Sequence, residues 1–301
     1  MPQRKRMNKK SIVVLMVAIL LIAGGWLVYS RYMRRHAEQT PVASNWPSAP
    51  VEPPSAATPS VPSAGRPLPS LPKEAAPPEP VFALRQGETL QFDANVTKLN
   101  STVARLKIIA VEKRNLGSRP SWHLQAFAHT ENPYRMVFEL DDQFDSYSDA
   151  ASMVSRQYEM HLSERGQKVE SIQRMLPSVN DPTPPGISAA RVLPGTRDPL
   201  GMLNYLRGID WSNVSEVRSP VYDGHKLYDV RAKLVAKSVP VTVPAGSFKP
   251  MKIELRVLDN GVEMKDAYFL LYLTNDQRRL PVLLEAVLPF ATASLELTKV
   301  G

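Results

Sequence analysis

From about residue 81 to its end, the chain alternates apolar and polar side chains with a period of two. Residues 252–258 (KIELRVL) and 228–234 (YDVRAKL) show the alternation most clearly, and residues 122–128 and 158–162 follow it. Successive side chains of a β-strand point to opposite faces, so each segment has one apolar and one polar face. The pattern predicts antiparallel strands, each with a single buried side.

Short turns separate the alternating segments. Asp223-Gly224 and Asn260-Gly261 tolerate positive φ, and residues 244–247 (PAGS) form another tight connection. From about residue 216 onward strand follows strand, which is typical of a meander. Curling such a sheet around its apolar face buries that face and reduces open edges, so we expect a barrel or half-barrel.

One helix is expected within this mainly β domain, in the run RDPLGMLNYLRGIDW at residues 197–211. Asp198 is a favourable N-cap, and Pro199 suits the first helical position. Leucines spaced three residues apart give the helix an apolar stripe, and Gly208 can end it.

Residues 11–30 are expected to form a transmembrane helix. The 19 residues from Ser11 to Tyr29 carry no charge, and at 1.5 Å per residue they span about 28 Å, close to the hydrocarbon thickness of a bilayer. Five cations precede the span and three follow it, which places residues 1–10 in the cytoplasm as a basic tail. The alternative is a cleaved signal peptide, for which Ala23-Gly24-Gly25 supplies small residues.

Residues 31–80 are expected to form a periplasmic, disordered, proline-rich linker. Thirteen prolines lie between positions 37 and 80, together with many Ala and Ser residues. Such a segment lacks the apolar surface that would offset its ordering entropy, so we expect a semi-extended spacer. Proline-rich runs can also be ligands for aromatic grooves. Residues 81–301 then form a β-rich periplasmic domain beyond the inner membrane.

The basic character of the chain is concentrated near its beginning. Ten of the 37 Lys and Arg residues and four of the 29 acidic residues lie within the first 80 positions, so the remaining 27 cations and 25 anions give residues 81–301 a net charge of +2. Nucleic-acid binding requires a clustered excess of cations, so we expect no nucleic-acid partner. The chain contains no cysteine, which excludes disulfides, thiol nucleophiles and thiolate metal sites.

Four runs of the β domain carry a resemblance to a known family. They are MVFELDDQFDSYSDAASMVSRQYEMHLSERGQK, RDPLGMLNYLRGIDW, VTVPAGSFKPMKIELRV and LYLTNDQRRLPVLLEAVLPFATASLEL. In this order they resemble the bacterial envelope family called domain of unknown function 3108, over about residues 85–300. The strongest pieces are residues 243–248 (VPAGSF) and 276–281 (DQRRLP).

The resemblance implies an exported, β-rich domain that is periplasmic or membrane-anchored, and it brings no established activity or catalytic residues. Tyr272 stands where we expect a tryptophan, so a bulky aromatic side chain is kept. The residues to which we assign a structural role are Asp198, Pro199, Pro244, Gly246, Phe248 and Pro281.

The run NDQRR at residues 275–279 lies between apolar strands expected at 268–273 and 280–286. Asn275 and Asp276 are turn residues, and Pro281 suits an edge or the start of a strand. The favoured interpretation is a structural hairpin with an arginine clamp. Its alternative is a ligand-binding site; the candidate ligand-binding residues are Arg278, Arg279, Asp276 and Tyr272.

Four aspartates lie in the run LDDQFDSYSD at residues 140–149. The favoured interpretation is a polar turn after a strand at 136–140, which the resemblance implies is anchored by Phe144 and Tyr147. The alternative is a calcium site, although the glycine and terminal glutamate of an EF-hand loop are missing. The histidines are scattered, with no ligand-spaced neighbour at His161 or His225, so no metal or cofactor is predicted.

The function favoured by the sequence is a non-catalytic, inner-membrane-anchored periplasmic domain that binds an envelope component, either a lipid, a glycan or a protein. The alternative is an interaction scaffold in a cell-envelope assembly, and a hydrolase ranks below both. An internal cavity of several hundred Å³ would favour ligand binding, and a solid core would favour a scaffold.

Overall fold

A computed structural model describes residues 78, 80–81, 84–97, 99, 101–178, 181–182, 184–265, 267–289 and 291–301. The basic tail at 1–10, the transmembrane helix at 11–30 and nearly all of the linker at 31–80 lie outside the described residues, so these expectations stay predictions. Within the described part of the chain, no helix combines the length and the apolar character needed to cross a membrane.

The described residues are mainly β, as expected. The first seven strands are β1 (Thr89–Val96), β2 (Thr102–Leu116), β3 (Arg119–Thr130), β4 (Asp141–Asp149), β5 (Ser155–Glu164), β6 (Gln167–Leu176) and β7 (Ser188–Arg191). A 3-10 helix η1 (Tyr134–Met136) precedes β4, and α3 (Pro199–Gly208) follows β7. The later strands are β8 (Glu216–Tyr222), β9 (Leu227–Ala236), β10 (Val241–Val243), β11 (Gly246–Phe248), β12 (Met251–Asp259), β13 (Val262–Glu263), β14 (Tyr268–Leu273), β15 (Pro281–Leu288) and β16 (Ala291–Val300).

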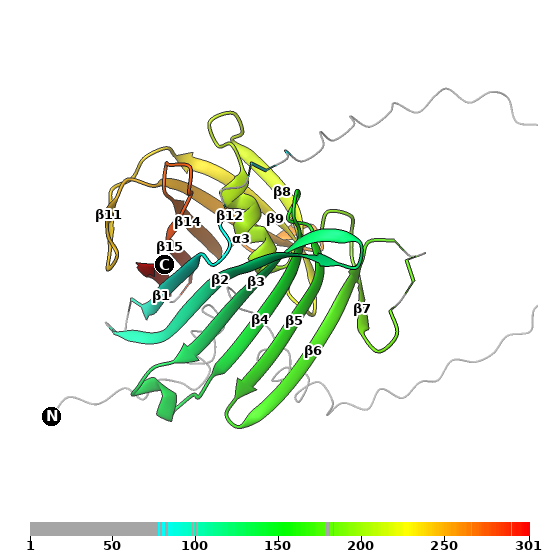
Figure 1. The fold of residues 1–301 in the computed structure, drawn as a ribbon. Helices are drawn as coiled ribbons and strands as arrows, with labels where there is room; N and C mark the ends of the chain where they lie inside the picture. Colours follow the sequence, from blue (N-terminus) through cyan, green and yellow to red (C-terminus); the bar gives the residue numbers. More distant parts are fainter. Residues whose placement is uncertain are drawn as a thin grey trace, which may run out of the picture.

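Fourteen strands form one sheet in the order β7-β6-β5-β4-β3-β2-β1-β16-β15-β14-β12-β9-β8, with β13 paired to β12. Nearly every neighbour in space is therefore a neighbour in sequence, which confirms the meander. The pairing of β1 with β16 joins the first half of the domain to the second. The sheet ends at β7 and β8 and is not closed, so of the two expected forms the complete barrel does not occur (Figure 1).

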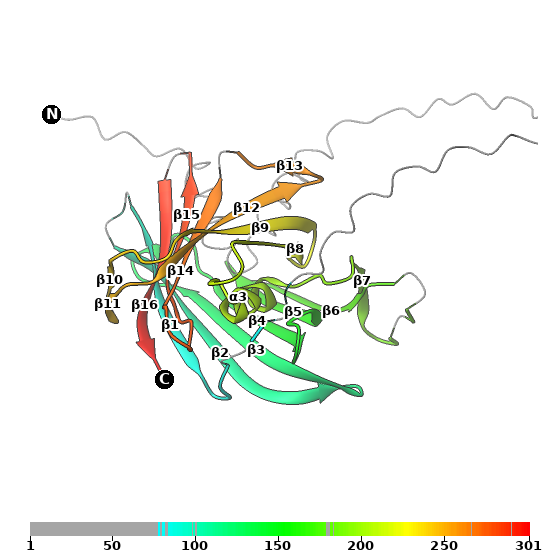
Figure 2. The ribbon, with the colours of Figure 1, turned by 90° about the horizontal axis from the view of Figure 1, so that it is seen from above.

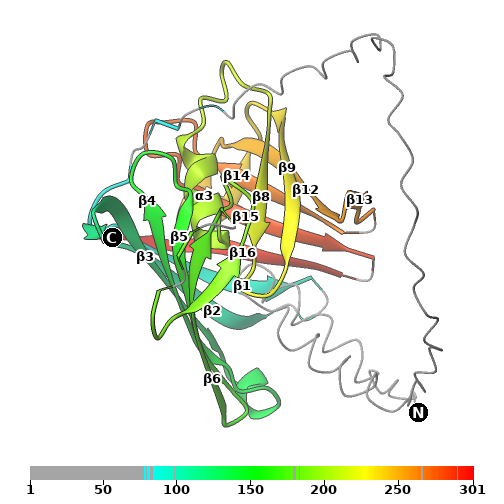
Figure 3. The same ribbon diagram turned by 90° about the vertical axis from the view of Figure 1, so that its right-hand side faces the viewer.

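The sheet curves around α3. Seen from above, α3 appears nearly end-on inside the curve, with β3, β4 and β5 on one side and β8 and β9 on the other (Figure 2). The side view shows the same relationship, with α3 between the green and yellow strands (Figure 3). A helix placed this way covers apolar surface from both halves of the sheet at once, because it contacts β3, β4 and β8.

The start of α3 confirms the sequence prediction. The Asp198 carboxylate accepts a hydrogen bond from Gly201 N at 2.8 Å, and Pro199 occupies the first helical position. The segment before the helix runs between two strands: Ser155 N donates to Thr196 O, and Arg197 pairs in parallel with Val221 of β8. The chain entering α3 is thus fixed to both β5 and β8.

The predicted turns are present. Asn260 and Gly261 have φ values of +50° and +79°, as a tight hairpin of this kind requires, and they connect β12 to β13. Gly224, at φ +100°, lies in the Asp223 turn between β8 and β9. Pro244 and Ala245 connect β10 to β11, and Ala245 N donates to Leu297 O of β16 at 2.9 Å.

The alternation of side chains produces the core. Buried and half-buried residues alternate without exception along β1, and Leu90, Phe92 and Ala94 are at most 4% exposed. Ile253 on β12 and Leu297 on β16 are fully buried in the same core. Each large aliphatic side chain buried this way contributes about 1.5 to 3 kcal/mol relative to an exposed one, so burial of one apolar face per strand stabilises the curved sheet.

The prediction for residues 136–149 is wrong. Met136 belongs to η1 rather than to a strand, and the supposed polar turn is β4 itself. Composition was misleading because β4 buries polar side chains that have partners: Asp142 accepts from Ser163 N at 2.9 Å, and Ser146 donates to Asp198 at 2.5 Å. A strand whose inner positions are polar shows no apolar alternation, and the tertiary contacts decide its structure.

Candidate functional site

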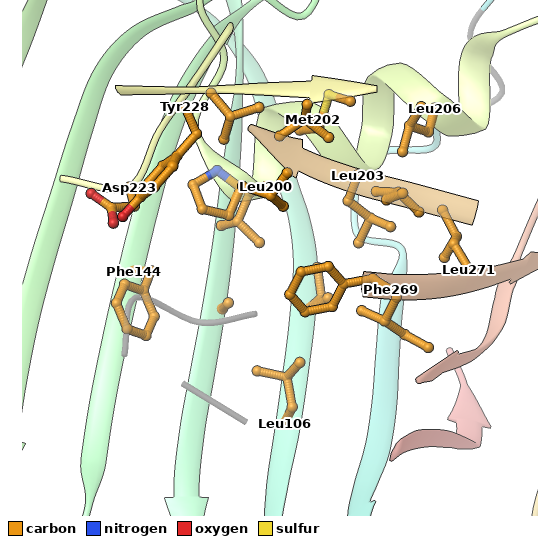
Figure 4. A pocket seen from close by; sticks show the side chains of 18 of the residues that line it. Leu106, Phe144, Leu200, Met202, Leu203, Leu206, Asp223, Tyr228, Phe269 and Leu271 are labelled. Atoms are coloured by element: carbon orange, nitrogen blue, oxygen red, sulfur yellow. The ribbon is translucent and has the colours of Figure 1, made fainter. Parts of the chain in front are cut away.

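A cavity of about 180 Å³ lies inside the curve of the sheet. Its walls come from β2, β3, β4 and β5 on one side, from β8, β9, β12, β14 and β15 on the other, and from α3. Leu106, Phe144, Leu203 and Phe269 are typical of the lining, which is almost entirely apolar (Figure 4). The cavity exists because the inner faces of the two halves of the sheet are apolar at these positions and α3 does not fill the space between them.

One end of the cavity is polar. Asp223 and Tyr228 lie there, away from Leu206 and Leu271 (Figure 4). Asp223 is only 8% exposed. Its Oδ1 accepts hydrogen bonds from His225 N at 2.8 Å and Lys226 N at 2.7 Å, whereas its Oδ2 has no hydrogen-bond partner in the described part of the chain. None of the described lining residues is Lys, Arg or His.

Burial sets the protonation behaviour of this end. It raises the pKa of the Asp223 carboxyl, against hydrogen bonds from backbone amides that favour the charged form. Burial also raises the pKa of Tyr158 well above its usual value, and the negative charges of Asp198, Asp223 and Asp142 add to this effect. Tyr158 therefore keeps its hydroxyl proton at neutral pH.

The residues proposed from sequence as ligand-binding lie elsewhere. Asp276 Oδ1 accepts hydrogen bonds from Thr274 Oγ1 at 2.7 Å and from the backbone N–H groups of Arg278 and Arg279 at 3.0 and 3.1 Å, so it caps the turn. Arg279 adopts a φ of +47°, which shows that the strand has not yet begun. Tyr272 donates to Glu285 at 2.8 Å. None of these four residues lines the cavity, and their role in ligand binding stays a prediction.

The turn is held by an arginine that sequence analysis missed. Arg207, in the last turn of α3, donates to the backbone oxygens of Arg278 and Arg279 at 3.2 Å each. Its Nη2 lies 2.7 Å from Glu88 Oε1, and Arg278 Nη2 approaches the other oxygen of Glu88 at 3.5 Å. Pro281 is the first residue of β15, as expected. β14 and β15 pair antiparallel across this turn, and the arginine that holds the turn is Arg207 rather than Arg278 or Arg279.

A second polar cluster lies on the outer face of β4 and β5. One donor atom each from Asp145, Glu159 and His161 lies within 4.8 Å of the other two. Sequence analysis gave His161 no ligand-spaced neighbour. This is wrong, because Glu159 lies two residues away on the same face of β5, and Asp145 of β4 is directly opposite Glu159. The four aspartates of residues 141–149, in contrast, do not form one site: Asp141 and Asp149 pair with Arg135 and Arg156.

No curated protein matches the sequence significantly. A solved structure described as a beta-barrel-like protein of domain of unknown function DUF1849, from Brucella abortus, is similar at 9% identity and a TM-score of 0.47, over 71% of this chain and 97% of that one.

Two further solved structures are similar at a TM-score of 0.35. One, from Bacteroides fragilis, is described as an exported protein with a YmcC-like fold, at 10% identity over 74% of this chain and 99% of that one. The other, from Parabacteroides distasonis, is described as a lipoprotein, at 14% identity over the same shares.

The sequence itself gives the clearest assignment. A family model described as "Protein of unknown function (DUF3108)" matches residues 91–298, which is well over half of the chain and nearly all of the β domain. The resemblance noted from the VPAGSF and DQRRLP segments is confirmed, since both lie inside the matched region. The chain belongs to the DUF3108 family of proteins of unknown function.

Proposed function

We propose that the domain is a non-catalytic module that binds the apolar end of an envelope amphiphile, a lipid in the first instance, in the cavity beneath α3. The observation that carries the proposal is the cavity itself: a space of about 180 Å³ with an apolar lining from both halves of the sheet. Apolar cavities of about 150 Å³ already bind benzene, so this space accommodates a small apolar group.

The size of the cavity also limits the ligand. Pockets that enclose a whole drug-sized molecule measure about 300 to 1,000 Å³, and this cavity is smaller. The space therefore suits the end of one hydrocarbon chain rather than a complete lipid. The volume is below the several hundred Å³ expected of a ligand-binding barrel. It favours binding of one end of the ligand over enclosure of the whole ligand.

Asp223 gives the ligand an orientation. Its buried Oδ2 lacks a hydrogen-bond donor in the described residues, and a buried polar atom left this way costs free energy. A hydroxyl or amine of the ligand at this end of the cavity would supply the donor. The proposed ligand is therefore an amphiphile with a donor group on its polar end.

The proposed setting is the periplasm, with residues 11–30 as the inner-membrane tether and residues 31–80 as the spacer. Support comes from the uncharged span and from the excess of cations before it. A spacer of this length could reach on the order of 100 Å when stretched, which suits a module that meets its ligand away from the membrane surface.

The test is binding of a fluorescent long-chain alcohol to the full-length chain and to a variant that fills the cavity. Leu203 is half-buried on α3 and lines the cavity. Leu203→Trp should place the larger ring in that space and abolish saturable binding. Val235→Trp is the matched control because Val235 is 46% exposed on β9 and does not line the cavity.

The outcomes are distinct. Binding by the wild type and by Val235→Trp, but not by Leu203→Trp, supports the proposal. Equal binding by all three chains would assign the probe to another surface, and no binding by the wild type would favour the alternative of an interaction scaffold whose core needs no ligand. Circular dichroism of each variant establishes that it is folded.

A further inference from the structure

The outer-face cluster has the geometry of a metal site. Asp145 of β4 and Glu159 of β5 occupy directly opposed positions, and His161 follows on the same face of β5. His161 Nε2 lies 3.9 Å from Asp145 Oδ2 and 3.5 Å from Glu159 Oε2. Donor atoms that share a zinc ion at 2.0 to 2.2 Å are separated by about this much, so small rotations bring all three onto one ion.

The charges of the cluster favour a cation. Like charges at directly opposed positions of neighbouring strands are destabilising, and here the Asp145 carboxylate is only 5% exposed and that of Glu159 13%. Glu170 adds a third carboxylate beside His161. Arg174 of β6 interacts electrostatically with Glu159. The His123 ring donates a hydrogen bond to Asp145 Oδ1 at 2.6 Å.

The outer partners orient the donor atoms. In the neutral ring, His161 Nδ1 donates to Glu170 and Nε2 is the acceptor nitrogen that faces the two carboxylates. A carboxylate on the far nitrogen is the usual partner of a zinc-bound histidine, and it fixes both the tautomer and the ring orientation. Asp145 is held in turn by the Gln125 and Gln143 side-chain amides, each at 2.7 Å.

Gln157 lies two residues before Glu159 on β5 and carries a buried oxygen that no described residue contacts as a donor. This residue is 8% exposed, and its Nε2 donates to Glu159. Its buried Oε1 has no hydrogen-bond partner in the described part of the chain. A water bound to a metal ion beside Glu159 is a strong donor and would satisfy this oxygen.

We propose that Asp145, Glu159 and His161 bind one divalent transition-metal ion, with water completing its coordination. The donor set of one imidazole and two carboxylates fits Zn²⁺ better than Ca²⁺, which prefers six to eight oxygen ligands. The ion links β4 to β5 and, through Glu170, to β6. Because β6 and β7 form one open end of the sheet, the ion stabilises the part of the sheet that lacks a further neighbour.

The test is equilibrium dialysis of the untagged full-length protein against Zn²⁺, with bound metal measured by elemental mass spectrometry. We expect one ion per chain, and we expect Ca²⁺ not to compete. His161→Gln and Glu159→Gln each remove a ligand and should abolish stoichiometric binding. Glu170→Gln removes only the orienting partner and should weaken affinity by roughly 10- to 100-fold.

His129→Gln is the matched control, because His129 also bonds a glutamate, Glu131 at 3.1 Å, but lies outside the cluster. It should bind zinc as the wild type does. A wild type that binds no more zinc than His161→Gln and Glu159→Gln overturns the proposal and leaves the cluster as an ion-pair network around a protonated His161. Equal loss in His129→Gln overturns it as well, since binding would then reflect scattered histidines. If His161→Gln fails to fold, the comparison of Glu159→Gln with Glu170→Gln decides.

Discussion

Arg207 Nη2 lies 2.7 Å from Glu88 Oε1, although 119 residues separate the two in sequence. Their side chains are 6% and 3% exposed, so this is a buried ion pair. Glu88 directly precedes β1, and Arg207 is on α3, so the pair fixes the helix to the strand that joins the two halves of the sheet. Through the carbonyls of Arg278 and Arg279, it also fixes the turn before β15.

Breaking this pair from one side should be costly. Arg207→Met leaves the Glu88 carboxylate buried and without its closest cation, and such changes cost about 3 to 5 kcal/mol. Denaturant unfolding of the full-length chain measures the loss. Replacing both partners, as Glu88→Leu with Arg207→Met, should restore a large part of it, because no charge is then buried alone.

The exposed pair Arg218 and Asp229 is the control for this experiment, with side chains 51% and 35% exposed. Arg218→Ala should change the free energy of unfolding by less than about 1 kcal/mol. A cost for Arg207→Met as small as that for Arg218→Ala would contradict the clamp.

Asp198 is the second point at which α3 is fixed. It caps Gly201 N through Oδ1, and its Oδ2 accepts from Ser146 and Ser155 at 2.5 Å each. Asp198→Ala should lower the free energy of unfolding by about 2 to 4 kcal/mol, since the cap is lost and two buried hydroxyls lose their acceptor. Asp198→Asn keeps the cap oxygen and should cost less than half as much. Equal losses for the two variants would mean that capping contributes nothing here.

Gly201 should resist a substitution that helices usually favour. Alanine in a helix interior is more stable than glycine by about 1 kcal/mol. A Cβ at Gly201, however, would lie 2.8 Å from Ser155 Oγ, 2.9 Å from Ser148 Oγ and 3.1 Å from the backbone oxygen of Met153. Gly201→Ala should therefore destabilise the protein by about 1 to 3 kcal/mol, which thermal unfolding would detect. A rise in melting temperature would show that α3 does not approach β4 and β5 this closely.

The stability of the protein should depend on pH through Asp142. Burial raises the pKa of this carboxyl to about 6, from an ordinary value of 3.8. The folded state therefore holds the proton more tightly than the unfolded state, so the stability from this group is full below pH 4 and is lost as pH rises through 6. The loss amounts to roughly 3 kcal/mol.

Asp142→Asn removes this dependence and keeps an acceptor for Ser163 N. The variant should be more stable than the wild type at pH 7.5, and the difference should shrink toward pH 4 in denaturant unfolding at both values. Greater stability of the wild type at pH 7.5 would reverse the sign and contradict the burial of an uncompensated carboxyl.

How much of the fold could be predicted depends on where the information lies. Asn260-Gly261 and the cap at Asp198 are local signals, and the structure confirms both. The meander follows from local turns joined in sequence order. The joining of the two halves of the sheet is different, since it depends on β1 pairing with β16 across nearly the whole domain. The sheet remains open at β7 and β8.

The sites show the same division. Residues 141–149 were misread because their polar inner side chains hydrogen-bond to Ser163 and Asp198, partners remote in sequence. The outer-face cluster was missed because the sequence does not give the pairing register of β4 with β5, although one local signal existed. Arg165 and Gly166, at φ +50° and +74°, form a two-residue hairpin turn that places His161 opposite Glu170. The cavity has no local signal, because its walls come from strands on both sides of the sheet.

The claim that the cavity binds an amphiphile is tested most directly by native mass spectrometry of the full-length protein purified from the cells that produce it. We predict one additional mass per chain, in the range of a lipid, that is retained by Val235→Trp and absent from Leu203→Trp. Wild-type and Leu203→Trp chains that both appear without any bound mass would contradict the claim.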